Sequence, residues 1–130
     1  MKVLFDTNVL ISAFLTRGQT FDIIKDAFYK HEVYYTDYVL GEFEKTLAKK
    51  FFQLSNKSKD LAVFVLKKYL TQGVSASKTE AICRDPHDDQ VLADAVANHI
   101  DVIVTGDKDL LDLKKHKRIR IISPNEYWNL

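Results

Sequence analysis

The stretch KVLFDTNVLISAF, residues 2–14, reads as a buried apolar strand that three polar residues interrupt. Val3 to Phe5 fit a short strand of a central sheet, and the apolar residues that follow predict a helical turn or two over 9–14. Asp6 stands between these two segments. Burying a lone carboxylate is costly, so Asp6 is expected at a strand end, next to a cation, or neutralised.

Strand-like and helix-like segments alternate along the rest of the chain. Residues 32–36, 101–104 and 118–122 are rich in the β-branched and aromatic side chains that favour strands. Helical apolar spacing predicts helices over 21–30, 38–51, 56–70, 86–98 and 108–113, with a terminal turn at 125–128. The expected caps are Thr20, Asp37, either Ser55 or Asn56, and Asp85, and residues 74–83 carry no clear pattern. The alternation predicts an α/β fold with three α/β/α layers, in which helices flank a central, mostly parallel sheet.

Composition narrows the class of protein. The 130 residues, 46% of them hydrophobic, fit one domain over residues 1–130. Lys and Arg total 19 against 18 acids, so any contact with nucleic acid must use a local patch. One cysteine excludes an internal disulfide and favours the cytoplasm. We also expect no signal peptide and no membrane-spanning segment.

Five acids are expected at one edge of the sheet. Asp6 and Asp107 each follow a buried strand, and sites in open α/β sheets gather at the carboxyl ends of the strands. Asp88 and Asp89 lie in the first turn of the helix at 86–98, and Glu42 can point back to the same edge. Clustered carboxylates repel unless a cation lies among them, and oxygen ligands suit Mg²⁺ or Mn²⁺. The pattern therefore predicts a metal site for phosphoryl chemistry.

Simpler interpretations exist for most of these acids. Asp88 and Asp89 are also typical of an acidic helix N-terminus, and Glu42 taken alone is typical of a solvated helix residue. Asp107 and Asp109 can cap and charge the short helix at 108–113. Asp6 is harder to explain structurally, because we expect no local Lys or Arg within reach of an acid that directly follows a buried strand.

Four segments together resemble the PIN-domain ribonucleases, in the branch identified as toxins of toxin-antitoxin systems. They are LFDTNVLISAF at 4–14, YVLGEFEKTL at 38–47, CRDPHDDQVLADAV at 83–96 and VIVTGDKDLL at 102–111. Each motif alone is weak, but all occur in the family's order over nearly the whole chain. The resemblance implies a parallel-sheet α/β/α fold. It also implies Mg²⁺- or Mn²⁺-dependent hydrolysis of single-stranded RNA that leaves the phosphate on the 5′ side.

The resemblance also implies the site residues by position. The catalytic acids and primary metal ligands would be Asp6, Glu42, Asp89 and Asp107. Asp88 competes with Asp89 for the third position, and Asp109 is a further candidate ligand. Asn8 and Thr105 match supporting polar positions and are of the right type to orient carboxylates by hydrogen bonds.

Partners follow from the same resemblance. Relatives commonly form homodimers and are silenced by a small antitoxin protein. Flanking RNA phosphates need cations, for which the candidates are residues 114–120 and the trio Lys45, Lys49 and Lys50. Two alternatives stay open: a PIN-like binding module without turnover, and an RNA-processing nuclease without an antitoxin.

Other classes fit the residues less well. Asn8 stands where a phosphatase of the haloacid dehalogenase type needs a second Asp, and only one acid follows the first strand, against a receiver-like domain. The Gly-rich phosphate loop is absent from the sequence. Cys83 and His87 have the spacing of half a zinc site, without a second paired motif.

Overall fold

The computed structural model describes residues 1–16 and 18–130. The strands are β1 (Lys2–Phe5), β2 (Glu32–Tyr35), β3 (Thr71–Gln72), β4 (Val102–Val104), β5 (Lys115–His116) and β6 (Ile119–Ile122). The helices are α1 (Thr7–Thr16), α2 (Gln19–Lys30), α3 (Asp37–Lys50), α4 (Asn56–Tyr69), α5 (Pro86–Ala97) and α6 (Lys108–Leu113), followed by the 3₁₀ helix η1 (Asn125–Asn129).

The strands form one sheet in the order β3-β2-β1-β4-β6-β5. All neighbouring pairs are parallel except β5–β6, which is antiparallel. The predicted α/β class is confirmed. β2 and β3 lie on one side of β1, and β4, β6 and β5 lie on the other. The strand order therefore reverses between β1 and β4, and sheets of this class place their sites at the carboxyl ends of the strands at such a switch point.

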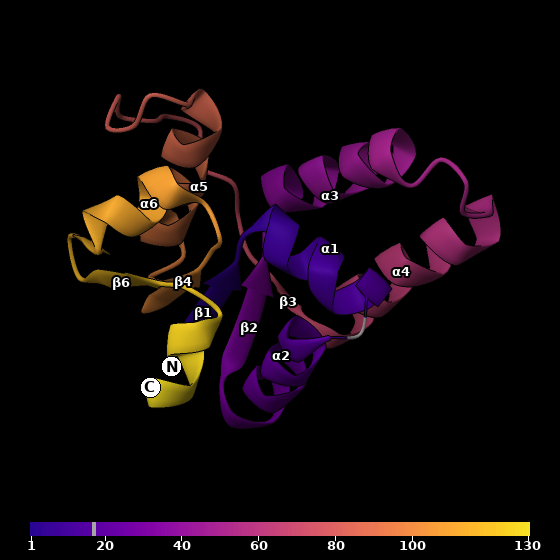
Figure 1. Ribbon diagram of the computed structural model, residues 1–130. Coiled ribbons are helices and arrows are strands. Elements are labelled where there is room, and N and C mark those ends of the chain that lie inside the picture. The colour runs from indigo at the N-terminus through magenta and orange to yellow at the C-terminus, as the bar shows by residue number, and fades with distance from the viewer. Residues whose placement is uncertain (17) are drawn as a thin grey trace.

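Alternating side chains of the strands separate the core into two halves. Val3 and Phe5 face one cluster with α1 to α4, whereas Leu4 faces a second cluster with α5 and α6. In β4, Val102 and Val104 share the first cluster while Ile103 belongs to the second. Because successive strand residues point to opposite faces, apolar strands of this kind need helices on both sides. Figure 1 shows this arrangement, with α5 and α6 gathered on one side of the strands.

The local signals mostly acted as expected. Ser55 caps α4, Asp85 caps α5 with Pro86 at its first position, and Asp107 caps α6. Three details differ. Thr36 caps α3 in place of Asp37, α2 begins at Gln19 before Thr20, and α1 begins at Thr7, earlier than expected.

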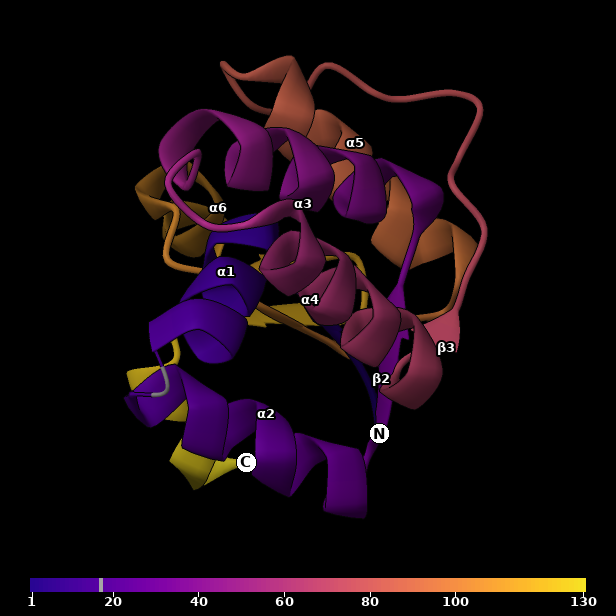
Figure 2. The same cartoon turned by 90° about the vertical axis from the view of Figure 1, so that its right-hand side faces the viewer.

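The sequence did not predict β3 and β5. Each has only two residues, too few to show a period of two, and each adds to a longer strand that was expected. Figure 2 shows the segment between β3 and α5 as a long loop on the outside of the molecule. Among the described residues, no helix is both long and apolar enough to cross a membrane.

Candidate active site

Asp6 lies at the switch point of the sheet, with only 3% of its surface exposed. Its backbone N–H continues the strand by donating to the Val104 carbonyl, and its own carbonyl begins α1. Thr7 N–H donates to Oδ1 and the Thr105 hydroxyl donates to Oδ2, both at 2.8 Å. These donors hold the carboxylate at the carboxyl edge, where a strand passes into a helix.

Asp107 is fixed to the same point through Thr105. Its backbone N–H donates to the Thr105 hydroxyl oxygen at 3.0 Å, so that one hydroxyl links Asp6 and Asp107. Oδ1 of Asp107 accepts from the N–H groups of Asp109 and Leu110 and thereby caps α6. The simple capping role considered for Asp107 is therefore real, and it uses one of its two oxygens.

Asp88 is the buried acid of this edge. Its side chain is fully buried, and neither of its oxygens has a hydrogen-bond partner among the described residues. One oxygen each of Asp88, Asp107 and Asp109 lies within 4.8 Å of the others. Nearly all buried polar groups in proteins are paired, so two unpartnered carboxylate oxygens in one side chain call for a missing ligand.

Burial, with the negative charge of Asp107, raises the pKa of Asp88 to about 6. At Asp6 burial also acts to raise the pKa, but the hydrogen bonds from His87 and Thr105 outweigh it and leave that pKa below its ordinary value. The two acids thus differ because Asp6 has donors and Asp88 has none. A divalent cation beside Asp88 would supply the missing positive charge.

Asp89 points elsewhere. Its Oδ1 accepts hydrogen bonds from the backbone N–H groups of Ile82 and Cys83, at 3.0 and 2.8 Å. Adjacent residues on a helix do not face the same way, so α5 presents Asp88 to the other acids and Asp89 to the loop before the helix. Of the two candidates for the third position, the structure brings Asp88 into the group.

Glu42 and Asn8 lie beside the acid group rather than in it. Both line a polar hollow of about 470 Å³ whose other walls include Tyr38, Thr46 and His87. Oε1 of Glu42 is 3.6 Å from Nζ of Lys45. Within the described residues, the Asn8 side chain makes no hydrogen bond to a carboxylate, unlike Thr105.

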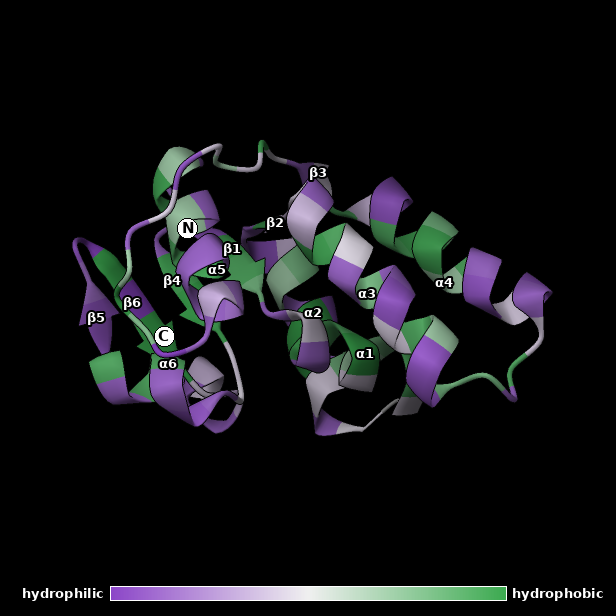
Figure 3. Ribbon diagram, turned by 90° about the horizontal axis from the view of Figure 1, so that it is seen from above, coloured by the Kyte–Doolittle hydropathy of each residue, from purple (hydrophilic) through white to green (hydrophobic). Residues whose placement is uncertain are grey.

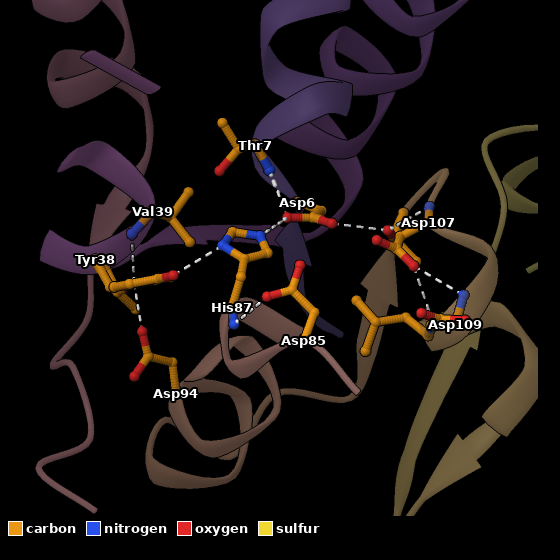
Figure 4. Close-up of polar contacts among 12 residues, drawn as sticks. Asp6, Thr7, Tyr38, Val39, Asp85, His87, Asp94, Asp107 and Asp109 are labelled. Atoms are coloured by element: carbon orange, nitrogen blue, oxygen red, sulfur yellow. Dashed lines mark hydrogen bonds and ion pairs between the residues drawn. The ribbon is translucent and has the colours of Figure 1, made fainter. Parts of the chain in front are cut away.

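Figure 4 shows the His87 side chain between Asp6 and Tyr38, which is one of the residues that line this hollow. Its Nε2 lies 3.4 Å from Oδ1 of Asp6, and its Nδ1 lies 2.8 Å from the Tyr38 hydroxyl. The hydrogen bond to Asp6 raises the pKa of His87, more than burial lowers it. From the sequence, His87 was interpreted only as half of a possible zinc site. Its place one residue before Asp88, in the first turn of a helix that starts at the site, was the signal that could have found it.

The sequence analysis also did not predict the contacts of two other residues, Arg84 and Asp94. Arg84 pairs with Asp109, at 2.7 Å between Nη2 and Oδ1. Asp94 is fully buried, and its oxygens accept hydrogen bonds from Thr36, Ser75, Gln90 and the backbone N–H of Ala76. Asp94 lies on the apolar face of α5, three residues after Val91, which was the available signal.

The two groups of cations that were expected around the site lie in different parts of the structure. Lys45 lies beside Glu42, at the site. The basic segment 114–120 instead surrounds β5 and the first half of β6, whose Arg120 pairs with Val102 at the start of β4. Because the acids follow the carboxyl end of β4, most of this segment lies toward the opposite edge of the sheet.

A family model described as PIN domain matches residues 2–109. The chain belongs to the PIN domain family. Every acid described above falls within the matched part. No curated protein sequence matches the chain significantly.

Two solved structures share the PIN fold of this chain at low sequence identity. The first is a crystal structure of VapBC2 from Rickettsia felis bound to a DNA fragment from their promoter. It has a TM-score of 0.71 and 13% identity, over 95% of this chain and 98% of that chain. The second is VapC20 of Mycobacterium tuberculosis, a sarcin-ricin loop cleaving toxin. It has a TM-score of 0.61 and 12% identity, over 91% of this chain and 98% of that chain.

A divalent metal, which PIN nucleases use, fits the residues present. The donor set is made of carboxylates, the chemistry that Mg²⁺ and Mn²⁺ prefer, and the unpartnered oxygens of Asp88 lie next to Asp107 and Asp109. Asp88, Asp107 and Asp109 are therefore the carboxylates that would hold such an ion.

Proposed function

We propose that this chain is a Mg²⁺- or Mn²⁺-dependent endoribonuclease that hydrolyses single-stranded RNA and acts as the toxin of a toxin-antitoxin pair. The observation that carries the proposal is the buried, unpartnered carboxylate of Asp88 beside Asp107 and Asp109. Membership in a family of nucleases supports the reaction class.

Asp88, Asp107 and Asp109 are the residues that would hold the cation. A bound Mg²⁺ or Mn²⁺ supplies charge that stabilises the anionic phosphate and lowers the pKa of an attacking water. Asp6 stays ionised through its donors and adds negative charge at the edge of this group. Catalytic or metal-binding roles for Asp6, Glu42 and Asp89 stay predictions.

The residues around the group would orient the RNA. Thr105 fixes Asp6 and Asp107 relative to one another through its hydroxyl. The hollow next to His87 is also lined by Glu42 and Asn8, and it adjoins the acids through the Asp6–His87 contact. An unpaired nucleotide next to the cleaved bond fits such a polar hollow.

An antitoxin is the partner that we propose, together with a homodimeric state and a cytoplasmic location. VapBC2, one of the similar structures, supports the toxin-antitoxin assignment. Exposed apolar side chains on α2 and α4 supply a surface for a partner, with Phe28, Leu61, Phe64 and Tyr69 each at least 40% exposed. Size-exclusion chromatography with light scattering tests the dimer, and dissociation to monomers at working concentration would contradict it.

Cleavage of a mixed single-stranded RNA tests the nuclease directly. Purified protein should cut with Mn²⁺ or Mg²⁺, lose the activity in EDTA, and lose at least ~100-fold of it in Asp88→Asn. Asp60→Asn, an exposed acid on α4, is the matched control and should cut normally. A folded protein that takes up metal but cuts no RNA would favour the binding-module alternative.

A further inference from the structure

The β5–β6 hairpin carries a dense group of cations that the proposed reaction does not use. The residues share exposure to solvent and a position on or next to this hairpin: Lys114, Lys115, Lys117, Arg118 and Arg120. We call them the hairpin cations. Figure 3 shows β5 as a hydrophilic strand at one end of the molecule, and β5 is the edge of the sheet.

Two of the hairpin cations lie directly opposite one another. Lys115 of β5 is the register partner of Arg120 of β6 in the antiparallel pair. Like charges directly opposite on neighbouring strands destabilise a sheet. Among the described residues, the hairpin cations make one ion pair, from Lys117 to Glu80 at 3.7 Å. The fold therefore holds positive charge together here with little internal compensation.

The backbone conformation of two of these lysines is a second destabilising feature of the hairpin. Lys114 and Lys117 have φ values of 61° and 54°, in the left-handed region that favours Gly or Asn. Lys114 directly follows α6 as its C-cap, and Lys117 begins the loop between β5 and β6. Lysine has no conformational advantage at either position, although the charge of Lys114 suits the C-terminus of α6.

The hollows next to the hairpin carry charges of both signs. One of about 350 Å³ is lined by Lys78, His116 and Lys117 together with Glu80 and Asp89, and a second of about 450 Å³ by Lys117 and Arg118 together with Asp101. The uncompensated positive charge therefore lies on the exposed hairpin and not inside these hollows. None of the large exposed hydrophobic side chains belongs to residues 114–120. A membrane surface would use such side chains, whereas a chain of phosphates needs only cations.

We propose that the hairpin cations form a second RNA-binding surface, which holds phosphates several nucleotides away from the bond that is cut. This inference rests on the proposed function, because it takes RNA as the polyanion. Arg118 lies four residues before Ile122, the carboxyl end of β6, so the loop is roughly 13 Å from the site edge at ~3.3 Å per residue. A duplex strand advances ~3.4 Å per phosphate and an extended single strand advances further, so fewer than about four nucleotides cover this distance.

The test measures RNA binding in EDTA, where metal-dependent cleavage is absent. The hairpin variant combines Lys115→Gln, Arg118→Gln and Arg120→Gln. Its control removes the same charge from exposed positions on α4 with Lys57→Gln, Lys67→Gln and Lys68→Gln. Fluorescence anisotropy follows two RNAs, one a dinucleotide, which extends little beyond the cleaved bond, and one of about twenty nucleotides.

The hairpin variant should bind the long RNA about tenfold or more weakly than wild type. The slope of log K against log salt should become shallower by about 2, since each lost phosphate contact removes ~0.7. Binding of the short RNA should be unchanged in both variants, and the α4 control should bind the long RNA like wild type.

Three results would overturn this second surface: equal binding of the long RNA by the hairpin variant and wild type, an equal loss in the α4 control, or an equal loss for the short RNA. The first of these results, if the hairpin variant also aggregates, would show that the cations only protect the edge strand. Failure of the nuclease itself looks different. Wild type would not cut either RNA with Mn²⁺, yet the hairpin variant would still lose affinity for the long one.

Discussion

The hydroxyl of Thr105 lies 2.8 Å from Oδ2 of Asp6, between two acids that are 101 residues apart in the chain. The same oxygen accepts from the N–H of Asp107 at 3.0 Å. One side chain at the end of β4 therefore sets the relative position of the acids that follow β1 and β4.

Thr105→Val should disrupt the site while keeping the side chain's shape. The valine leaves Oδ2 of Asp6 without its donor in a buried position, which should lower the free energy of unfolding by about 1–3 kcal/mol. Metal-dependent cleavage should fall by roughly 10–100-fold. Urea unfolding and the cleavage assay measure both effects. Thr105→Ser keeps the hydroxyl and should restore most activity; equal losses in the two variants would argue against this role.

Asp88→Asn and Asp89→Asn should have different effects. Asp88 lies with Asp107 and Asp109, so its replacement should remove the stabilisation by Mn²⁺, which is ~2.7 kcal/mol at a hundredfold excess over Kd. Asp89 holds the backbone of Ile82 and Cys83, so its replacement should loosen that loop and keep the response to Mn²⁺. Thermal unfolding with and without Mn²⁺ measures the first effect, and amide hydrogen exchange the second. The reverse pattern would assign the third position to Asp89.

Replacing Asp94 should weaken the connection between α5 and the loop after β3. Four donors converge on this fully buried carboxylate, and an Asn side chain would turn an amide N–H₂ toward some of them. Asp94→Asn should therefore cost about 2–4 kcal/mol and speed hydrogen exchange at Ala76. The exposed Asp60→Asn is the control. A loss below ~0.5 kcal/mol, the range of ordinary surface substitutions, would contradict this role.

Because of the contact between Tyr127 and Asp26, the free energy of unfolding should depend on pH in the acid range. The hydrogen bond from the Tyr127 hydroxyl, 2.6 Å long, and the ion pair with Lys30 hold the pKa of Asp26 below its ordinary value. The folded state thus binds fewer protons than the unfolded state at acid pH. The contribution is complete above the unfolded pKa of ~3.9 and disappears as the pH falls through the lower folded pKa.

Tyr127→Phe removes that hydrogen bond. The pKa of Asp26 should move toward its ordinary value, as NMR titration can follow, and the urea midpoint should fall at pH 7. Below the folded pKa of Asp26, the difference between variant and wild type should narrow. A gap of constant size across this range would show that the hydroxyl acts without the charge of Asp26.

Local rules accounted for much of the fold. Val3, Leu4 and Phe5 alternate between two cores, so a strand covered on both faces could be predicted from their hydrophobicity alone. Asp85 and Pro86 fixed the start of α5 by a short-range hydrogen bond and a preset φ. β3 and β5 could not be predicted, because two-residue strands form by pairing with a neighbouring strand and are too short to show a period of two.

The candidate site was harder to predict, because the spacing of residues in the sequence does not show which way each side chain points. The sequence placed Asp88 and Asp89 together at the sheet edge, but a helix separates adjacent residues by about 100°, and only packing decides which one faces Asp107. The contact between His87 and Asp6 joins residues 81 positions apart, and the basic segment at 114–120 turned away because β5 runs antiparallel.

The most direct test of the metal site is an anomalous difference map from crystals grown with Mn²⁺. We predict a strong peak within coordination distance of Asp88, Asp107 and Asp109, and its loss in Asp88→Asn crystals of unchanged fold. A fully loaded crystal with no peak at these three carboxylates would contradict the metal site, and with it the proposed mechanism of RNA hydrolysis.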